Sequence, residues 1–242
     1  MELFGGDFTL DGFGHTLGNI GPNLIELELH HVDNIDLKAV TILSISCQRL
    51  KYLSFSGCIF NHPDIDLMEN SPENHLYIIQ QQREEKALIS ELIPFLDLEI
   101  ISIASQCPGK LLTLLLSLCI NVKKLNIGIN CGVNDEIFDN VFSNNKFQYL
   151  EKVEIKKNSE LTLATLSNLL LYCDNLQSVL DVEEWSQVDK ADLAELKYHM
   201  KENNIDLVLE EEPENMRGVS LYQICQTALK EKYKRSEWFD DA

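Results

Sequence analysis

The sequence has no long hydrophobic run, and basic residues are scarce. Its most hydrophobic stretch, residues 111–122, covers 12 positions, whereas a membrane-spanning helix needs about 20. The N-terminal residues contain no basic region followed by a hydrophobic one, so they do not indicate a secretory signal peptide. Only 20 lysines and arginines stand against 39 aspartates and glutamates, for a net charge of −19. Because this charge repels phosphate backbones and anionic lipids, we expect neither nucleic acid nor membranes as partners.

Paired cysteines are also absent. The chain has seven cysteines, an odd number, and none forms a C-x-x-C motif. This usage favours free buried thiols over a disulfide framework, and hence a reducing compartment. We therefore expect the protein in the cytoplasm or the nucleus.

Motifs for catalysis and cofactor binding are missing as well. The six histidines show no metal-ligand spacing, and the glycines of residues 126–135 belong to neither a G-x-G-x-x-G motif nor a phosphate-binding loop with its lysine. No nucleophile, base and orienting residue stand out together. The sequence thus predicts a protein that is not an enzyme and that needs no cofactor or metal.

What the sequence does contain is a repeated phrase. Residues 24–32 recur 26 positions later as residues 50–58, and the shared pattern is L-x-x-L-x-L. Such a period predicts a repeat architecture. The six copies begin at Leu24, Leu50, Leu98, Val122, Leu150 and Leu176. Three residues before the copies stand Gly21, Cys47, Phe95, Cys119, Phe147 and Cys173. Eight residues after each start come Val32, Cys58, Gln106, Asn130, Asn158 and Glu184.

Each phrase is typical of a short buried strand. Alternate residues of a strand point to opposite faces, so Leu27 and Leu29 are expected in the core and Glu28 on the outside. Parallel pairing of successive copies requires a crossover. Residues 133–142 and 161–173 supply it, because their apolar residues recur at helical spacing. We expect Asn or Cys after the strand to bond the backbone groups left over at the turn, or to fill a tight site there.

The pattern C-x-x-L-x-x-L-x-L-x-x-C/N, followed by such a helix, resembles the cysteine-containing leucine-rich repeat of F-box/LRR proteins, which are ribonuclease-inhibitor-like. The resemblance covers roughly residues 1–210. It implies an α/β fold, namely a right-handed leucine-rich-repeat (LRR) solenoid with a parallel β-sheet on the concave face and helices on the convex face. The cysteines at the repeated position would stack along one ridge, and we interpret them as small packing residues.

Three departures from the period shape the expected domain organisation. A polar insertion of about residues 61–80 is expected to be partly disordered and to be closed by a helix near residues 80–93. The last copy decays into one more helix and an edge strand at 205–209. At the other end, the repeat offset places Met1 and Leu3 inside a repeat, so we expect a region to be missing upstream.

The outward positions of the strands are the predicted partner-binding surface. The central positions carry small residues and leave room for a ligand chain, while three lysines form a basic patch suited to an acidic or phosphorylated segment. Ordinary solvated lysines are the alternative interpretation. The candidate residues are Glu28, His30, Tyr52, Ser54, Ser102, Lys124, Asn126, Lys152, Glu154 and Lys156.

A further motif follows the repeats. After an acidic linker at residues 211–219, residues 220–242 are expected to form a helix and tail with one apolar face. Leu221, Cys225 and Leu229 resemble the BC box by which substrate receptors of ubiquitin ligases dock on elongin C. The same stripe is also typical of a helix that covers the last repeat.

Two functions therefore stay open. The resemblance favours a non-enzymatic protein-protein interaction module that is the substrate-recognition region of a ubiquitin-ligase receptor, with a protein partner on the concave face and a ligase adaptor as a second partner. The alternative is a plain LRR scaffold or inhibitor that binds one partner without a link to ubiquitin.

Overall fold

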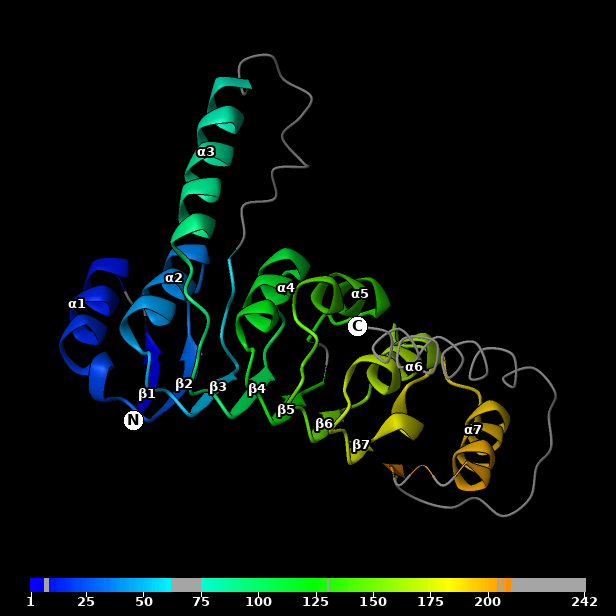
Figure 1. The fold of residues 1–242 in the computed structure, drawn as a ribbon. Helices are drawn as coiled ribbons and strands as arrows, with labels where there is room; N and C mark the ends of the chain where they lie inside the picture. Colours follow the sequence, from blue (N-terminus) through cyan, green and yellow to red (C-terminus); the bar gives the residue numbers. More distant parts are fainter. Residues whose placement is uncertain (7–8, 62–74, 130, 204, 206, 210–242) are drawn as a thin grey trace, which may run out of the picture.

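An eight-stranded, all-parallel sheet runs through the protein (Figure 1). The computed structural model describes residues 1–6, 9–61, 75–129, 131–203, 205 and 207–209. Each strand is hydrogen-bonded to the next one in the chain, so the order across the sheet is the order in the sequence. The strands are β1 (Glu2–Gly6), β2 (Glu26–Val32), β3 (Tyr52–Ser56), β4 (Ile100–Ala104), β5 (Lys124–Ile127), β6 (Lys152–Ile155), β7 (Ser178–Leu180) and β8 (Val208–Leu209).

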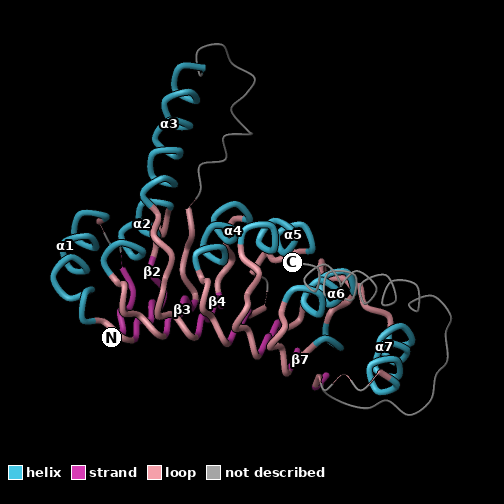
Figure 2. Tube along the Cα trace, viewed as in Figure 1, coloured by secondary structure: helices cyan, strands magenta, loops and turns pink. Residues whose placement is uncertain are grey.

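Helices alternate with these strands and lie along one side of the sheet, as Figure 2 shows. Several of them begin at a capping side chain: Asp36, Asn134 and Thr162 each accept a hydrogen bond from a backbone N–H of the first turn. None of the described helices is long and apolar enough to cross a membrane. The helices are α1 (Leu10–Ile20), α2 (Leu37–Ser46), α3 (His75–Glu91), α4 (Gly109–Leu118), α5 (Asp135–Asn144), α6 (Leu163–Tyr172) and α7 (Lys190–Glu202).

The core lies between the sheet and the helices, and it confirms the register predicted from the repeats. Leu27 pairs with Leu53, and the same row continues across β4, β5 and β6 with Ile101, Leu125 and Val153. All five are completely buried. The predicted offset of 26 also extends to the first strand, where Leu3 pairs with Leu29.

The residues three positions before each phrase form the turn that leads from helix to strand. The backbone N–H of Leu50 donates to the carbonyl of Cys47, and Leu176 donates to Cys173 in the same way. Space at this turn is limited: a Cβ on Gly21 would lie 2.8 Å from the carbonyl oxygen of Ser46. All six members of this series are buried, the two phenylalanines as well as Gly21 and the three cysteines.

Side chains of different types follow the strands and make the same kind of hydrogen bond, to a backbone carbonyl of the preceding strand. The Cys58 thiol donates to the Leu29 carbonyl at 3.2 Å, and the Cys131 thiol donates to the Ile103 carbonyl at 3.0 Å. After β7, the buried indole of Trp185 donates to the Ile155 carbonyl at 3.0 Å. Each bond ties the segment after one strand to a backbone carbonyl of the preceding strand.

Here the structure corrects the repeat alignment by one residue. The equivalent of Cys58 was expected at Asn130, which lies outside the described residues, but it is the neighbouring Cys131 that makes the bond. The expectation for Asn158 is confirmed: its amide donates to the Val133 carbonyl, and its side-chain oxygen accepts from the backbone N–H groups of Glu160 and Leu161.

The insertion contains more helix than expected. Residues 75–80 were predicted to belong to a partly disordered excursion, yet α3 begins at His75 and extends away from the other helices (Figure 1). The sequence between Pro72 and Pro94 contains no glycine or proline, which allows one continuous helix up to the position where Pro94 restricts the backbone before it. Its C-terminal end is anchored, because Leu88 packs against the core. The rest of the predicted excursion, residues 62–74, lies outside the described residues.

The other expected boundaries have mixed outcomes. The last helix and edge strand are present as α7 and β8, although β8 is limited to residues 208 and 209. The predicted linker at 211–219 and the C-terminal helix and tail at 220–242 lie outside the described residues. In β2 the alternation breaks at His31, whose φ of 52° is left-handed, so that His30 and His31 both keep exposed surface. The ring of His31 lies so close to Gly57 that a Cβ there would meet it at 2.5 Å.

Candidate functional site

The side of the sheet that faces away from the helices, here called the open face, carries all ten predicted partner-binding residues. The strand register arranges its side chains in three rows that cross the sheet. The first row contains Glu26, Tyr52, Ile100, Lys124, Lys152 and Ser178. The second contains Glu2, Glu28, Ser54, Ser102, Asn126 and Glu154. The third contains Phe4, His30, Ser56 and Ala104, and Gly128 and Lys156 continue it through backbone bonds to the preceding strands.

The basic end of the open face lies on β5 and β6. Lys124 pairs directly with Lys152 in the register, as predicted. Glu154 lies between two lysines, 3.8 Å from the Lys152 ammonium and 3.4 Å from that of Lys156. Lys124 is exposed and forms no ion pair within the described part of the chain. Two ammonium groups thus share the Glu154 carboxylate while Lys124 stands beside them, and the end keeps a surplus of positive charge on a strongly acidic protein.

The opposite end of the open face, on β1 and β2, is acidic and aromatic. Glu26 and Glu2 are exposed, and the carboxylate of Glu28 lies 3.3 Å from the Nε2 atom of His30. The ring of Phe4 stacks on that of His30, with 4.8 Å between the ring centroids, and remains 66% exposed. An exposed aromatic ring is a preferred contact for a partner. Sequence reasoning missed Phe4, although subtracting the period of 26 from His30 leads to it.

The middle of the open face carries no charged side chain, and most of its residues are small. Its residues on β3 and β4 include Ser102 and Ala104, and at Gly128 a Cβ would come within 2.9 Å of the Ala104 backbone. Ser54 is less available than predicted. It lies on this face but is only 7% exposed, because its short side chain stands between longer neighbours such as Tyr52 and Glu28. Ser54 can therefore shape the floor of a binding surface more readily than it can contact a partner.

A second charged region borders the sheet where the strands begin, here called the start edge. Glu99 accepts ion pairs from both sides: its two oxygens lie 3.3 Å from the Lys51 ammonium and 3.0 Å from the Lys123 ammonium. The residues occupy equivalent positions before β3, β4 and β5, and their backbones are hydrogen-bonded in the same order. The ion pairs keep the pKa of Glu99 below its usual value, first through the hydrogen bond from Lys123 and then through that from Lys51.

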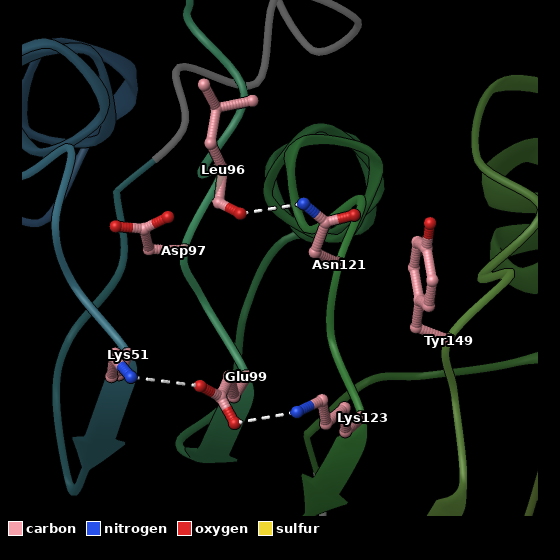
Figure 3. A pocket seen from close by; sticks show the side chains of 7 residues that line it. All are labelled: Lys51, Leu96, Asp97, Glu99, Asn121, Lys123 and Tyr149. Carbon is pink, nitrogen blue, oxygen red and sulfur yellow. Dashed lines mark hydrogen bonds and ion pairs between the residues drawn. The ribbon is translucent and has the colours of Figure 1, made fainter.

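These residues border an open pocket of about 420 Å³, shown in Figure 3. Its floor includes Asn121, whose amide donates to the Leu96 carbonyl at 2.7 Å. Asn175 makes the equivalent bond to the Gln148 carbonyl two repeats later. Because both lysines in the pocket point toward Glu99 and the asparagine bond recurs elsewhere, we interpret the start edge as a connection between repeats.

The environment of the described cysteines is that of unreactive thiols. All six in the described part are free and buried. Burial raises the pKa of the Cys47 thiol to about 11 and that of Cys107 to about 12, and it also raises the pKa of Cys119. A thiol that stays protonated is a poor nucleophile and a poor metal ligand. Within the described residues no three His, Cys, Asp or Glu side chains gather into a group that could hold a metal ion.

Comparison with known proteins adds no family assignment. No family model matches the chain. No curated protein matches it at a significant level. What this protein does must therefore be argued from its own repeat, its sheet and the charges on its open face.

Proposed function

We propose that this chain is a right-handed leucine-rich-repeat solenoid that works as a non-enzymatic protein-binding module. The recurring phrase and the parallel sheet in chain order support the repeat architecture. Crossovers between parallel strands of one sheet are right-handed in about 98% of cases, which supports the proposed hand. In such a solenoid the exposed sheet lies on the concave side and offers a continuous binding surface.

The observation that carries the binding proposal is the uncompensated charge on β5 and β6. Like charges directly opposite each other in a sheet are destabilising, yet Lys124 stands next to Lys152, and the carboxylate of Glu154 pairs with Lys152 and Lys156. Glu99 shows that this chain can place a carboxylate between lysines where the fold uses one. An acidic or phosphorylated segment of a partner would supply the missing negative charge.

The resemblance to F-box/LRR proteins sharpens the proposal. We infer that the bound partner is a substrate that the module presents to a ubiquitin ligase in the cytoplasm or nucleus. Leu221, Cys225 and Leu229, which resemble an elongin C dock, would connect the module to the ligase. They lie outside the described residues, so this part rests on the sequence.

The test is co-purification from cells with charge-reversed variants. Lys124→Glu with Lys152→Glu should remove the partner. Lys38→Glu with Lys110→Glu is the matched control, because it changes the net charge equally at exposed positions in the first turns of α2 and α4. Retention of the partner by the first variant, at unchanged far-UV circular dichroism, would contradict the proposed surface.

A second experiment separates the ligase from a plain scaffold. Elongin B and C, or the adaptor that F-box proteins bind, should co-purify with the unaltered chain. Leu221→Ser with Leu229→Ser should remove elongin while the partner of the open face remains. If no ligase adaptor co-purifies while that partner does, the protein is a scaffold or inhibitor instead.

A further inference from the structure

The acidic and basic side chains of the open face lie mainly at opposite ends of the sheet, along the direction that crosses its strands. Glu2, Glu26 and Glu28 lie on β1 and β2, whereas Lys124 and Lys152 lie on β5 and β6 and Lys156 directly follows β6. Between the two ends, the open face of β3 and β4 carries no charged side chain. The arrangement gives a partner two distinct charged contacts, separated by a neutral floor.

We propose that an extended segment of a partner protein crosses the strands of the open face with acidic residues over β5 and β6 and basic residues over β1 and β2. The inference rests on the proposed function and deepens it, because it states the charge pattern and the orientation of the segment. Charge complementarity of this kind fixes the register of a bound chain more than it adds to affinity.

The acidic end is suited to a lysine or arginine side chain for two reasons. Its carboxylates supply the opposite charge, and Phe4 exposes a ring beside them. A cation over an aromatic face gains a further attraction, and arginine is the more frequent cation in such contacts. The ring is held by its stack on His30, which in turn lies beside the Glu28 carboxylate. An aromatic side chain fixed next to carboxylates is pre-organised for a cation.

The middle strands set the spacing that the segment needs. From β2 to β5 and β6 there are three and four steps across the sheet. At about 4.8 Å for each step, the two charged ends are about 14–19 Å apart. An extended chain advances about 3.3 Å per residue, so its opposite charges should stand about four to six positions apart. The small residues Ser102, Ala104 and Gly128 allow its backbone to lie close to the sheet.

Synthetic peptides test this spacing directly. One peptide carries two glutamates, a four-residue Gly-Ser spacer and two lysines; its control has the same residues with the spacer moved to the ends. Binding is measured by fluorescence anisotropy at low salt. We expect the spaced peptide to bind roughly three- to tenfold more tightly, because it can reach both ends at once. Equal affinity for the two peptides would overturn the proposed pattern.

Charge-reversed proteins then assign each end. Glu26→Lys with Glu28→Lys should weaken the spaced peptide several-fold and leave a peptide with glutamates alone no weaker. Glu91→Lys with Glu202→Lys, at exposed C-terminal ends of α3 and α7, is the matched control. A paramagnetic label next to the peptide's glutamates should broaden amide signals of β6, and one next to its lysines those of β2.

The outcomes distinguish the two proposals. If Lys124→Glu with Lys152→Glu weakens binding but the spacer and the acidic end do not matter, the orientation is wrong and the binding surface stands. If neither end matters, or if the label broadens the helices instead, both proposals fail. If sedimentation shows a salt-sensitive dimer that Lys124→Glu with Lys152→Glu removes, the occupant of the open face is a second copy of this chain, and the proposed segment is wrong.

Discussion

Lys123 and Lys124 are adjacent in the sequence and lie in opposite electrostatic surroundings. The ammonium group of Lys123 is 3.0 Å from a Glu99 oxygen at the start edge, in a row where Lys51 completes the pairing. Lys124 points to the open face, next to Lys152, and has no ion pair in the described part of the chain. The backbone that places one lysine in a connection between repeats places the next one where no carboxylate of the described residues pairs with it.

The difference shows how to separate charges that serve the fold from charges available for binding. At the start edge the lysines and Glu99 alternate from repeat to repeat, so each charge is paired within the chain. On the open face, charges of one sign gather at each end. A row of charges that is paired within the chain gains little binding energy from a charged partner. In a row where like charges lie together, a partner of opposite charge relieves their repulsion when it binds.

The largest expected effect is at Leu125, the residue that follows Lys123 and Lys124 in the sequence. Its side chain is completely buried between the sheet and the helices, so Leu125→Ala leaves a cavity and should reduce the free energy of unfolding by about 2–5 kcal/mol. Lys124→Ala should leave it nearly unchanged. Thermal unfolding of both variants gives the measurement. Similar melting temperatures for the two would show that the repeat phrase does not define the core.

The buried cysteines predict that the free energy of unfolding depends on pH. Because the folded-state pKa of Cys47 is raised to about 11, whereas an unfolded thiol ionises near pH 8.5, folding favours the protonated form. The free energy of unfolding should be unaffected at low pH and should fall as the pH rises from about 9 toward 11.

Urea denaturation at pH 8 and pH 10.5 measures this fall for the unaltered chain and for Cys47→Ala. We expect a smaller fall in the variant, because it has lost one of the titrating thiols. The same fall in both proteins would mean that the Cys47 thiol titrates alike in the folded and unfolded states.

A smaller effect separates the two neighbouring lysines directly. Lys124→Gln should weaken an acidic peptide several-fold at low salt, and the loss should shrink as salt is added. Lys123→Gln removes the same charge one residue away, but from a side chain already paired with Glu99, and should change the affinity by less than about twofold. Equal losses in the two variants would show that only the overall charge matters.

The smallest expected effect is at Glu99. Ion pairs lower its pKa in the folded state, so its contribution to stability is present above the ordinary carboxyl pKa and is lost as the pH falls through the lowered value. Glu99→Gln should therefore lower the melting temperature slightly at pH 7, by about 2 °C or less. At pH 2 it should have no effect. A variant that is less stable at both pH values would indicate a packing role instead.

Most of the fold could be predicted from the sequence, because each copy of the repeat places apolar residues at the same core positions. The buried row from Leu27 to Val153 was predicted residue by residue, since one offset fixes both strand and register. Features that occur once were missed. Helix α3 begins at His75 because the sequence between Pro72 and Pro94 lacks helix breakers, and polar composition concealed this. The left-handed conformation of His31 depends on its approach to Gly57, which no local pattern indicates.

The open face was predictable in position but not in its electrostatics. Alternation in the strands identified which residues point outward, including Lys124 and Lys152. It could not show that Glu154 lies within ion-pair distance of two lysines, or that Ser54 is buried by its neighbours. Those facts depend on side-chain length and on contacts across strands. Phe4 was missed because the offset was carried back only to Met1 and Leu3, and the outward position beside them was not considered.

Site-specific photo-crosslinking in cells tests the central claim, that the open face is the surface that binds a partner. A photoreactive residue in place of Ser102, in the neutral middle of that face, should give a defined adduct. The same residue in place of Lys110, on α4 across the sheet, should give none, and Lys124→Glu with Lys152→Glu should abolish the Ser102 adduct. An adduct from Lys110 alone, or a Ser102 adduct indifferent to both lysines, would contradict the account.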